Sequence, residues 1–334
     1  MQDGYGRETE DLRISLTQRC NLDCVFCHME GQLPSSLELT AEEIERCVIA
    51  ATKVGVRRVK LTGGEPTLRS DLPEIVRRIA AHVEEVSMTT NGLLLDRLAV
   101  PLHEAGLRRV NVSLPSALPA TYRRLTGGDG LPAALRGIRA AHAAGIFPMK
   151  LNVVVLAGIT EQDAEREAIW EIAHEVGATL QFIEFEPVQG RVDGSIFRVL
   201  HAEITGLDSE VAGRAVQSER NPLHHRPRYT VPNGKGPMKI EIVRPLNNPE
   251  FCSACHRIRL TSYGALKGCL MTNEHLVETR PMLRDGATPD QLVPLFEQVI
   301  QHRRPFFRAD TSATPSLELP LVARAVSGAS PHLV

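Results

Sequence analysis

Six of the seven cysteines in this chain fall into two groups of three. The first cysteine group is Cys20, Cys24 and Cys27, a C-x3-C-x2-C run, and the second is Cys252, Cys255 and Cys269, a C-x2-C-x13-C run. Three thiolates leave one iron of a four-iron cube without a protein ligand, and that open iron can bind a small molecule. Each group therefore predicts a [4Fe–4S] cluster that takes part in chemistry, rather than a structural clamp.

Disulfides and zinc are the alternatives for these cysteines. Disulfides suit short exported chains, whereas this chain has 334 residues and shows no apolar signal peptide. A closed zinc site needs four nitrogen or sulfur ligands, and His28 or His256, each next to a cysteine, could supply the fourth. Zinc therefore stays open, above all for the second group. The seventh cysteine, Cys47, lies in a helical pattern and is expected in the core.

The bulk composition excludes several classes of function. With 43% hydrophobic residues and a formal net charge of −2, the chain gives no reason to expect nucleic-acid binding. One Trp and four Tyr also disfavour a protein that stacks single-stranded bases. No apolar run reaches the roughly 18 residues that a membrane span needs. Free thiols in this number indicate a reducing cytoplasm.

Strand-like and helix-like patterns alternate from the first residues to about residue 185. Strands are expected at residues 12–16, 56–61, 85–89, 109–114, 149–156 and 180–185. Helices are expected at 41–54, 72–82, 94–105, 131–144 and 161–176, the first with Thr40 and Glu43 as a capping box. Repeated βα units predict an α/β fold with a parallel sheet, here a partial (β/α)6 TIM-like barrel.

Several polar turns follow the expected strands and should meet at one rim of this barrel. They are the first cysteine group, Gly-Gly-Glu-Pro at 63–66, Thr-Thr-Asn-Gly at 89–92 and Ser113. The loops that follow parallel barrel strands lie at the same end, where barrel enzymes carry their chemistry. We therefore expect the candidate functional residues to converge there.

The alternation fades from about residue 191, which predicts a change of architecture. A further strand is expected at 238–243 and a last helix at 289–301. We expect a barrel over residues 1–190, a C-terminal region with the second cysteine group over 191–308, and a flexible tail over 309–334.

Together these features resemble the radical S-adenosylmethionine (SAM) enzymes, through the first cysteine group and Gly-Gly-Glu-Pro at 63–66 on a βα repeat. Longer stretches at 12–22, 61–66, 89–92, 150–155 and 251–261 resemble the GTP 3′,8-cyclases of molybdenum-cofactor biosynthesis. The segments at 27–31, 223–226 and 244–249 are similar to the archaeal branch of that family. The resemblance extends from residue 5 to about 307.

The resemblance implies two [4Fe–4S] clusters, one on each cysteine group. The first would bind SAM and reduce it to a 5′-deoxyadenosyl radical, and the second would hold the purine of GTP. The implied SAM-binding residues are Phe26, Gly64, Glu65 and Ser113. The implied substrate-binding residues are Arg13, Lys60, Thr89, Lys150, Arg257 and Arg259. A one-electron reductant of the flavodoxin or ferredoxin type is implied as well, and a homodimer is allowed.

The spacing of Arg257 and Arg259 by itself also indicates that they bind an anionic substrate. In an extended chain these alternate residues share one side, and arginine forks match phosphate oxygens with two hydrogen bonds. No residue is assigned as a general acid or base.

Three functions follow from the sequence. The first is GTP 3′,8-cyclisation. The second is a related radical SAM reaction on another nucleoside in secondary metabolism, such as a cytosylglucuronate-type decarboxylation, whose acidic substrate would also attract Arg and Lys. The third is a non-catalytic iron–sulfur or zinc protein, which would leave the turns at 63–66 and 89–92 unexplained.

The chain departs from the bacterial cyclases at four places. Gln181 stands where they have Arg, Glu186 where they have Met, and Pro115 where they have Asp. The bacterial chains end in Gly-Gly, whereas this sequence ends in Leu-Val.

Overall fold

The structure is a computed structural model that describes residues 1–160, 162–186, 188 and 201–306. The expected tail at 309–334 and the expected start of the C-terminal region at 191–200 lie outside the described residues.

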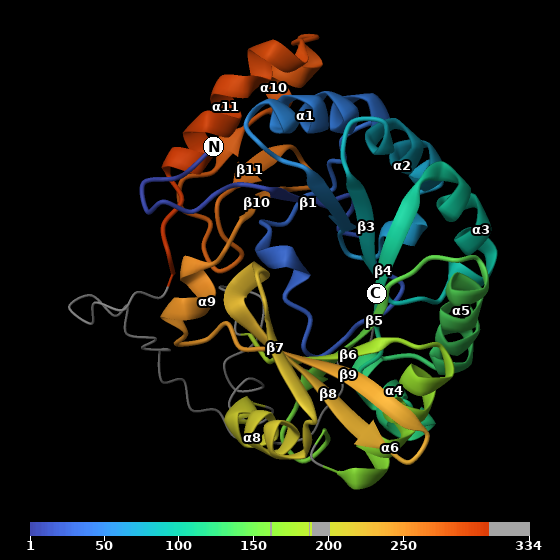
Figure 1. Cartoon of the computed structure of the whole chain (residues 1–334). Coiled ribbons are helices and arrows are strands. Elements are labelled where there is room, and N and C mark those ends of the chain that lie inside the picture. Colours follow the sequence, from blue (N-terminus) through green and yellow to red (C-terminus); the bar gives the residue numbers. More distant parts are fainter. Residues whose placement is uncertain (161, 187, 189–200, 307–334) are drawn as a thin grey trace, which may run out of the picture.

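Six parallel strands form the first half of the chain. They are β1 (Asp11–Ser15), β2 (Arg58–Thr62), β3 (Glu85–Thr90), β4 (Leu107–Ser113), β5 (Met149–Val155) and β6 (Thr179–Glu184). Each strand pairs in parallel with the next one along the chain. The strands curve into an open ring with the helices outside them (Figure 1), so the predicted α/β partial barrel is confirmed.

Helices cover the outer face of these strands. They are α1 (Ala41–Lys53), α2 (Leu72–Ala80), α3 (Leu95–Ala105), α4 (Pro119–Thr126), α5 (Leu131–Ala143) and α6 (Asp163–Glu175). All but α4 were predicted, with ends that differ by a few residues. The two turns of α4 bury only Tyr122, Leu125 and Thr126, too few positions for a recognisable apolar period. Cys47 is fully buried in α1, as expected.

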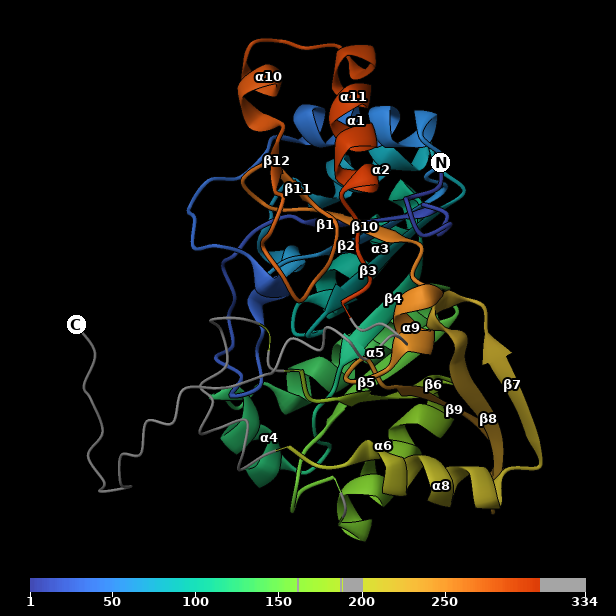
Figure 2. The ribbon, with the colours of Figure 1, turned by 90° about the vertical axis from the view of Figure 1, so that its left-hand side faces the viewer.

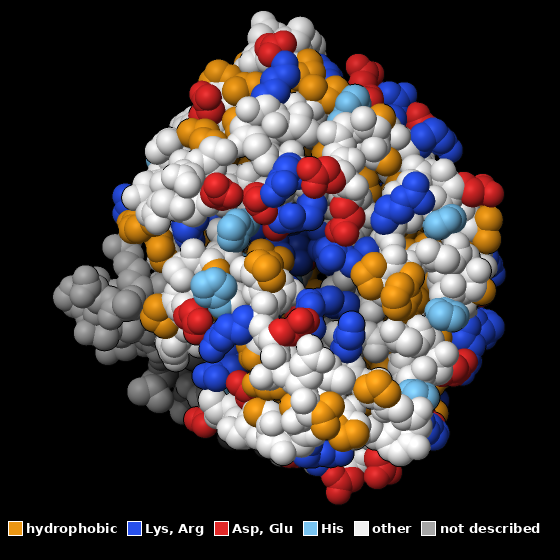
Figure 3. All heavy atoms as spheres, viewed as in Figure 1, with side chains coloured by type: hydrophobic (Ala, Val, Ile, Leu, Met, Phe, Trp, Pro, Cys, Tyr) orange, Lys and Arg blue, Asp and Glu red, His pale blue; other side chains and the backbone are white. Residues whose placement is uncertain are grey.

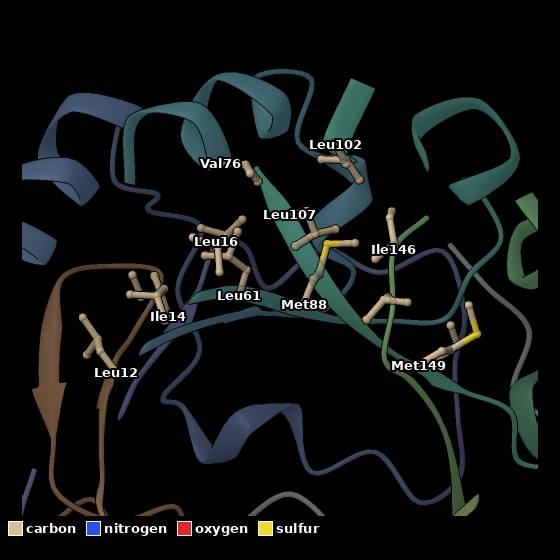
Figure 4. Close-up of a cluster of buried hydrophobic side chains, with 14 of the residues drawn as sticks. Leu12, Ile14, Leu16, Leu61, Val76, Met88, Leu102, Leu107, Ile146 and Met149 are labelled. Atoms are coloured by element: carbon tan, nitrogen blue, oxygen red, sulfur yellow. The ribbon is translucent and has the colours of Figure 1, made fainter. Parts of the chain in front are cut away.

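The two faces of the strands have opposite chemistry. In β1 and β2 the outward residues Leu12, Ile14 and Leu61 are fully buried and belong to the same hydrophobic core as Val76 of α2 and Leu102 of α3 (Figure 4). The alternate residues point the other way, because successive side chains of a strand face opposite sides. Parallel sheets usually bury apolar residues on both faces. The charged inner face found here therefore indicates an interior built for a ligand.

The C-terminal region extends this sheet at both edges. At one edge β9 (Gly236–Val243) pairs in parallel with β6, and β8 (Arg226–Asn233) and β7 (Gln217–Asn221) follow it in antiparallel order. At the other edge β10 (Arg257–Leu260) pairs in parallel with β1, followed by β11 (Ala265–Lys267) and β12 (Val277–Glu278). Among the described residues the result is one 12-stranded sheet whose two ends lie far apart in the molecule (Figure 2).

The described residues of this region also form helices α8 (Ile204–Arg214), α9 (Pro249–Ser253), α10 (Arg280–Arg284) and α11 (Pro289–Gln301). The expected strand at 238–243 and helix at 289–301 are confirmed by β9 and α11. Strands β7 and β8 were not predicted, because their exposed and half-buried residues lack the apolar alternation of a core strand. None of the described helices is long and apolar enough to cross a membrane.

The predicted capping box of α1 is present. The Glu43 N–H donates to Thr40 Oγ1 at 3.2 Å, and the Thr40 N–H donates to Glu43 Oε2 at 2.8 Å. We expect Thr40→Ala to lower the free energy of unfolding of the cluster-free protein by about 1 kcal/mol, measured by urea denaturation. Thr52→Ala, which removes only a hydroxyl that donates to the Ile49 carbonyl, is the matched control and should stay within about 0.5 kcal/mol of wild type. Equal losses in the two variants would contradict a capping role.

Candidate active site

A cavity of about 800 Å³ lies inside the ring of strands. Every residue that the sequence nominated lines it: Arg13, Cys20, Cys24, Phe26, Cys27, Lys60, Gly64, Glu65, Thr89, Ser113, Lys150, Cys252, Cys255, Arg257, Arg259 and Cys269. Lys and Arg side chains gather around the central hollow, with some acidic side chains among them (Figure 3). The first cysteine group, the turns at 63–66 and 89–92 and Ser113 therefore meet, as their places after the strands predicted.

The first cysteine group lies in the loop between β1 and the short 3-10 helix η1 (Met29–Gly31). None of the three forms a disulfide in the described structure. Burial and the neighbouring Cys27 and Cys20 raise the pKa of the Cys24 thiol to about 12, because each thiolate opposes ionisation of the next. A donor set of this kind needs positive charge at its centre before all three can ionise, and metal clusters supply it.

The separation of the cysteine sulfurs bears on the zinc alternative. In the described part of the chain, no three cysteine sulfurs lie within 4.8 Å of one another. One zinc ion with bonds of about 2.3 Å would hold its sulfurs about 3.8 Å apart. The described cysteines are therefore not arranged as three ligands of one zinc ion.

The turn at 63–66 packs directly against the cysteine loop. The Gly64 N–H donates to the Thr17 carbonyl at 2.7 Å, and the Glu65 N–H donates to the Arg19 carbonyl at 2.8 Å. A side chain at Gly64 would not fit, because its Cβ would lie 2.2 Å from the Arg19 carbonyl oxygen. This close approach explains why the position is a glycine.

The Glu65 carboxylate joins two of the predicted turns. It accepts hydrogen bonds from Thr67, from Thr90 Oγ1 at 2.7 Å and from the Asn91 N–H at 2.7 Å. The side chain is buried, and burial raises the pKa of its carboxyl even though these donors oppose the change. Glu65 thus holds the turn at 63–66 against the end of β3, whatever it contacts in the cavity.

The second cysteine group has buried arginines close to one of its thiols, Cys255. Cys252 lies in α9, Cys255 just after it and Cys269 after β11. Burial opposes ionisation of Cys255, but Arg303 and Arg257 outweigh burial and lower the pKa of this thiol. Burial raises the pKa of the Cys269 thiol in the same group, so the arginines favour ionisation at Cys255 and not at every thiol of the group.

A buried carboxylate, Glu30, links the cysteine loop to three strands. Its oxygens accept hydrogen bonds from Thr62 Oγ1 at 2.9 Å, from Arg13 Nη1 at 3.4 Å and from Arg259 Nη1. Burial opposes ionisation, but Arg13 and Arg259 outweigh it and hold the pKa of the Glu30 carboxyl well below its usual range. Two residues nominated for substrate binding are thus oriented by one carboxylate.

A second buried carboxylate, Glu241 on β9, has a similar position at the opposite edge of the barrel. It pairs with Lys150 at 2.8 Å, Arg226 at 3.0 Å and Arg228 at 3.1 Å. Its side chain is 0% exposed, and Arg226 and Lys150 outweigh burial and hold the pKa of its carboxyl well below the usual range. One negative charge therefore faces three positive ones.

Four residues of these two clusters were missed as site residues in the sequence, namely Glu30, Glu241, Arg226 and Arg228. Arg226 and Arg228 line the cavity and alternate along β8 as Arg257 and Arg259 do along β10. That spacing was the available signal. No sequence pattern marked Glu30 or Glu241, because a single Glu in a chain of 334 residues resembles any surface acid until its partners are known.

The Lys and Arg side chains on the cavity wall are buried close to one another, which disfavours their charged forms. Burial and the neighbouring Arg109 lower the pKa of Lys60 well below its usual value, and burial lowers that of Lys150 to about 8 although Glu241 counteracts it. Burial together with Arg13 and Arg259 also lowers the pKa of Arg257. Such a wall favours a ligand with several negative charges, which would relieve the repulsion.

Glu186 also faces this cavity. Burial raises the pKa of its carboxyl to about 7, although Arg259 and Arg13 counteract the rise. A carboxyl of this pKa is substantially protonated near neutral pH, so Glu186 places less negative charge in the cavity than its sequence implies.

Known proteins with similar sequences cover nearly the whole chain. A sequence model of the radical SAM superfamily matches residues 14–168, and one described as Molybdenum Cofactor Synthesis C matches residues 178–308. The probable GTP 3′,8-cyclase of Thermococcus kodakarensis is 42% identical over 92% of this chain and 100% of its own length. The one of Pyrococcus abyssi is 40% identical over 91% of this chain and 99% of its own length.

Solved structures share the fold at low sequence identity. Streptococcus suis SuiB bound to S-adenosylmethionine superposes with a TM-score of 0.57 and 15% identity, over 82% of this chain and 62% of SuiB. Native anSMEcpe with bound AdoMet gives a TM-score of 0.55 and 16% identity, over 87% of this chain and 81% of that one. This chain spans less than two thirds of SuiB, and the likeness concerns the fold alone.

The Glu30 contacts predict a large loss of stability on removal of the carboxylate. Glu30→Ala would leave Arg13 and Arg259 buried with an uncompensated charge, so we expect the free energy of unfolding of the cluster-free protein to fall by about 3–5 kcal/mol at pH 7. Glu104→Ala, at an exposed position of α3 with no ion pair in the described structure, is the control for loss of a glutamate side chain and should change it by less than about 0.5 kcal/mol.

The same pair of variants also has a pH dependence of known sign. The pKa of folded Glu30 is depressed, so its contribution is complete above the unfolded value of about 4.3 and is lost as the pH falls below it. The difference between wild type and Glu30→Ala should therefore shrink in acid. Urea denaturation at several pH values measures this, and a difference that grows in acid would contradict the ion-pair account.

Proposed function

Because the chain belongs to the GTP 3′,8-cyclase family of the radical SAM enzymes, we propose that it binds GTP and joins C3′ of the ribose to C8 of the guanine. It is an enzyme of the lyase type that uses SAM and [4Fe–4S] clusters in molybdenum-cofactor biosynthesis. The observation that carries the substrate assignment is the cavity in which two cysteine groups and a set of crowded cations line the same wall.

We propose that Cys20, Cys24 and Cys27 hold the SAM-binding cluster and that Cys252, Cys255 and Cys269 hold the second one. The position of all six cysteines on the wall of one cavity, without a disulfide among them in the described structure, supports this assignment. When bound, the first cluster and SAM supply a 5′-deoxyadenosyl radical, which removes a hydrogen atom from the substrate. Residues 1–190 would then carry SAM, and residues 191–308 the second cluster.

Four residues around the first cysteine group are proposed to bind SAM. Phe26 would contact the adenine, and the Gly64 carbonyl side of the turn would face the methionine amino group. Ser113, at the end of β4, would contact the carboxylate or ribose region. Glu65 would act with Gly64, mainly because its hydrogen bonds to Thr90 and Asn91 fix the position of that turn.

The triphosphate is proposed to lie among the cations that line this cavity. Lys60, Lys150 and Thr89 would bind it from strands β2, β5 and β3, with Arg13, Arg257 and Arg259 nearby. Arg226 and Arg228 join this set because they line the same cavity and share Glu241 with Lys150. An arginine side chain can donate two hydrogen bonds to phosphate oxygens, so these residues match a triphosphate in both charge and geometry.

The departures from the bacterial pattern fit this proposal. Gln181 Nε2 donates to Glu241 Oε1, the oxygen that also binds Arg226 at 3.0 Å. The Arg226 guanidinium, which comes from β8, therefore lies near Gln181 on β6, the position where the bacterial chains have an arginine. Pro115 and Glu186 line the cavity, whereas the residues that correspond to the Gly-Gly end lie outside the described residues.

The other two functions are not favoured. A cytosylglucuronate-type decarboxylase would also use Arg and Lys, but relatives that match over 92% of this chain are called probable GTP 3′,8-cyclases. A non-catalytic iron–sulfur or zinc protein is excluded by membership of the enzyme family.

The proposed partners are a one-electron reductant and a second copy of the chain, and the proposed location is the cytoplasm. A flavodoxin or ferredoxin is the reductant class that suits one-electron delivery to the clusters, and two copies of the chain could associate. Thiols that must stay reduced for cluster binding are compatible with the cytoplasm.

The central test is GTP-dependent turnover. Anaerobically reconstituted protein with SAM, dithionite and GTP should form 5′-deoxyadenosine and a cyclised purine, followed by liquid chromatography and mass spectrometry. Cys24→Ala should abolish both products, since the open iron exists only if three thiolates hold the cube. Cys47→Ala, buried in α1 away from the cavity, is the matched control and should keep both.

The iron content gives an independent readout. Wild type should bind about eight irons and Cys252→Ala with Cys255→Ala about four. Turnover of an acidic pyrimidine nucleoside without stimulation by GTP would replace the cyclase proposal, and deoxyadenosine formation by Cys24→Ala would overturn the assignment of the first cluster.

Lys150 predicts a pH-dependent affinity for GTP. With a pKa of about 8, Lys150 is charged below that pH and neutral above it, so the affinity should fall up to about tenfold between pH 7 and 9. Lys150→Arg should abolish most of this fall, because arginine keeps its charge. Equilibrium binding without reductant measures it, with Lys239→Arg, also on the cavity wall, as the control. The same fall in both variants would exclude Lys150 as its source.

A further inference from the structure

The residues before β1 fold against the second cysteine group. The chain start runs beside α11 in Figure 1, and the Glu10 and Asp11 N–H groups donate to the His256 carbonyl, at 3.0 and 3.1 Å. Within this segment the Asp3 carboxylate is 0% exposed and accepts the Tyr5 N–H at 2.9 Å and the Arg7 N–H at 3.0 Å. The segment is therefore an ordered part of the structure around the cysteines.

Two arginines connect this segment to the cysteine backbone. Arg7 Nη1 donates to the Cys252 carbonyl at 3.0 Å, and Arg303, which follows α11, donates through Nη2 to the Cys255 carbonyl. Arg303 also donates through Nη1 to Thr9 Oγ1 at 2.9 Å. Each arginine thus holds the backbone of one cysteine.

One carboxylate joins the two arginines. Asp3 Oδ2 lies 2.8 Å from Arg7 Nε and 3.7 Å from Arg303 Nη1. The Arg303 side chain is 0% exposed and the Arg7 side chain 6%. Two buried guanidinium groups share a single carboxylate, so the set carries one surplus positive charge.

Two N–H groups of these arginines also lack an acceptor. Arg7 Nη2 and Arg303 Nε are buried and make no hydrogen bond with the residues that the structure describes. Burying a charged donor without a partner is costly, so a surplus of charge and of donors at one place indicates a negatively charged partner. The residues whose carbonyls they hold, Cys252 and Cys255, are proposed ligands of such a partner.

We propose that Arg303 and Arg7 are positioning residues for the second iron–sulfur cluster, which fix the backbone of its ligands and supply the positive charge that raises its reduction potential. The proposal rests on the assignment of the second cysteine group to a cluster and is independent of the identity of the substrate.

The physical reason is charge balance at the cluster. A four-iron cube with three thiolate ligands is negatively charged, and reduction adds one more electron. The potentials of such clusters depend on net charge, hydrogen bonds and solvent exposure around them. Loss of a buried cation disfavours the reduced state, and loss of the carbonyl contacts also loosens the ligand loop.

The test compares Arg303→Gln, Arg303→Lys and Arg46→Gln in the full chain. Arg46 is a matched control because it also donates to two backbone carbonyls, those of Ala287 and Leu283, and also has a buried Nε without an acceptor in the described structure. Each variant is made with Cys20→Ala, Cys24→Ala and Cys27→Ala, so that only the second cluster remains. Its midpoint potential is followed by electron paramagnetic resonance without substrate, together with iron content and thermal stability.

We expect Arg303→Gln to shift the midpoint potential to a lower value and to reduce the retained iron. Arg303→Lys should keep the potential near wild type but lower thermal stability, since its ammonium keeps the charge without the fork of donors. Arg46→Gln should lose stability alone. Should Arg303→Gln fail to fold, Arg7→Gln, which has fewer contacts, carries the same test.

An unchanged potential in Arg303→Gln, with the same stability loss as Arg46→Gln, would overturn the proposal and leave a purely structural role. Absence of GTP turnover in wild type would instead affect only the proposed function, because the potential is measured without GTP.

Discussion

The contact on which the site most depends is the Glu30 carboxylate inside the barrel. It receives Thr62 from β2, Arg13 from β1 and Arg259 from β10, and it follows the first cysteine loop directly. The cysteine loop, two barrel strands and the strand that extends the sheet beyond β1 are therefore held by one charged group. The backbone of Glu30 is left-handed, with a φ of 55°. A strained backbone and a buried charge at one position persist only where the surrounding contacts compensate for both.

The interior is organised around incomplete charge compensation. Glu30 faces two arginines, and Glu241 faces Lys150, Arg226 and Arg228. Each carboxylate orients more cations than it neutralises. The cations are thus held in place before a ligand arrives, and the remaining positive charge attracts an anion. The Asp3 carboxylate repeats this arrangement with Arg7 and Arg303 beside the second cysteine group.

Much of the fold and the site could be predicted because the signals are local. The capping box at Thr40 and Glu43, the strand at 149–155 and the helix at 289–301 depend on residues within a few positions of each other. Strand alternation likewise placed Arg257 and Arg259 on one face. By contrast, α4 was too short to show a period, and β8 contains two prolines and few buried residues. Those segments are held by contacts with other elements rather than by their own pattern.

The sequence by itself determined the two cysteine groups, the βα repeat and the polar turns after the strands, since all of these are spacings within short segments. Only the tertiary structure decided which charges meet. Glu30 and Arg259 are 229 residues apart, Lys150 and Glu241 are 91 apart, and Arg7 and Cys252 are 245 apart. Each pair meets because the C-terminal strands join opposite edges of the barrel, β10 beside β1 and β9 beside β6. Pairing between distant strands follows from the burial of the whole sheet, and no short segment of sequence encodes it.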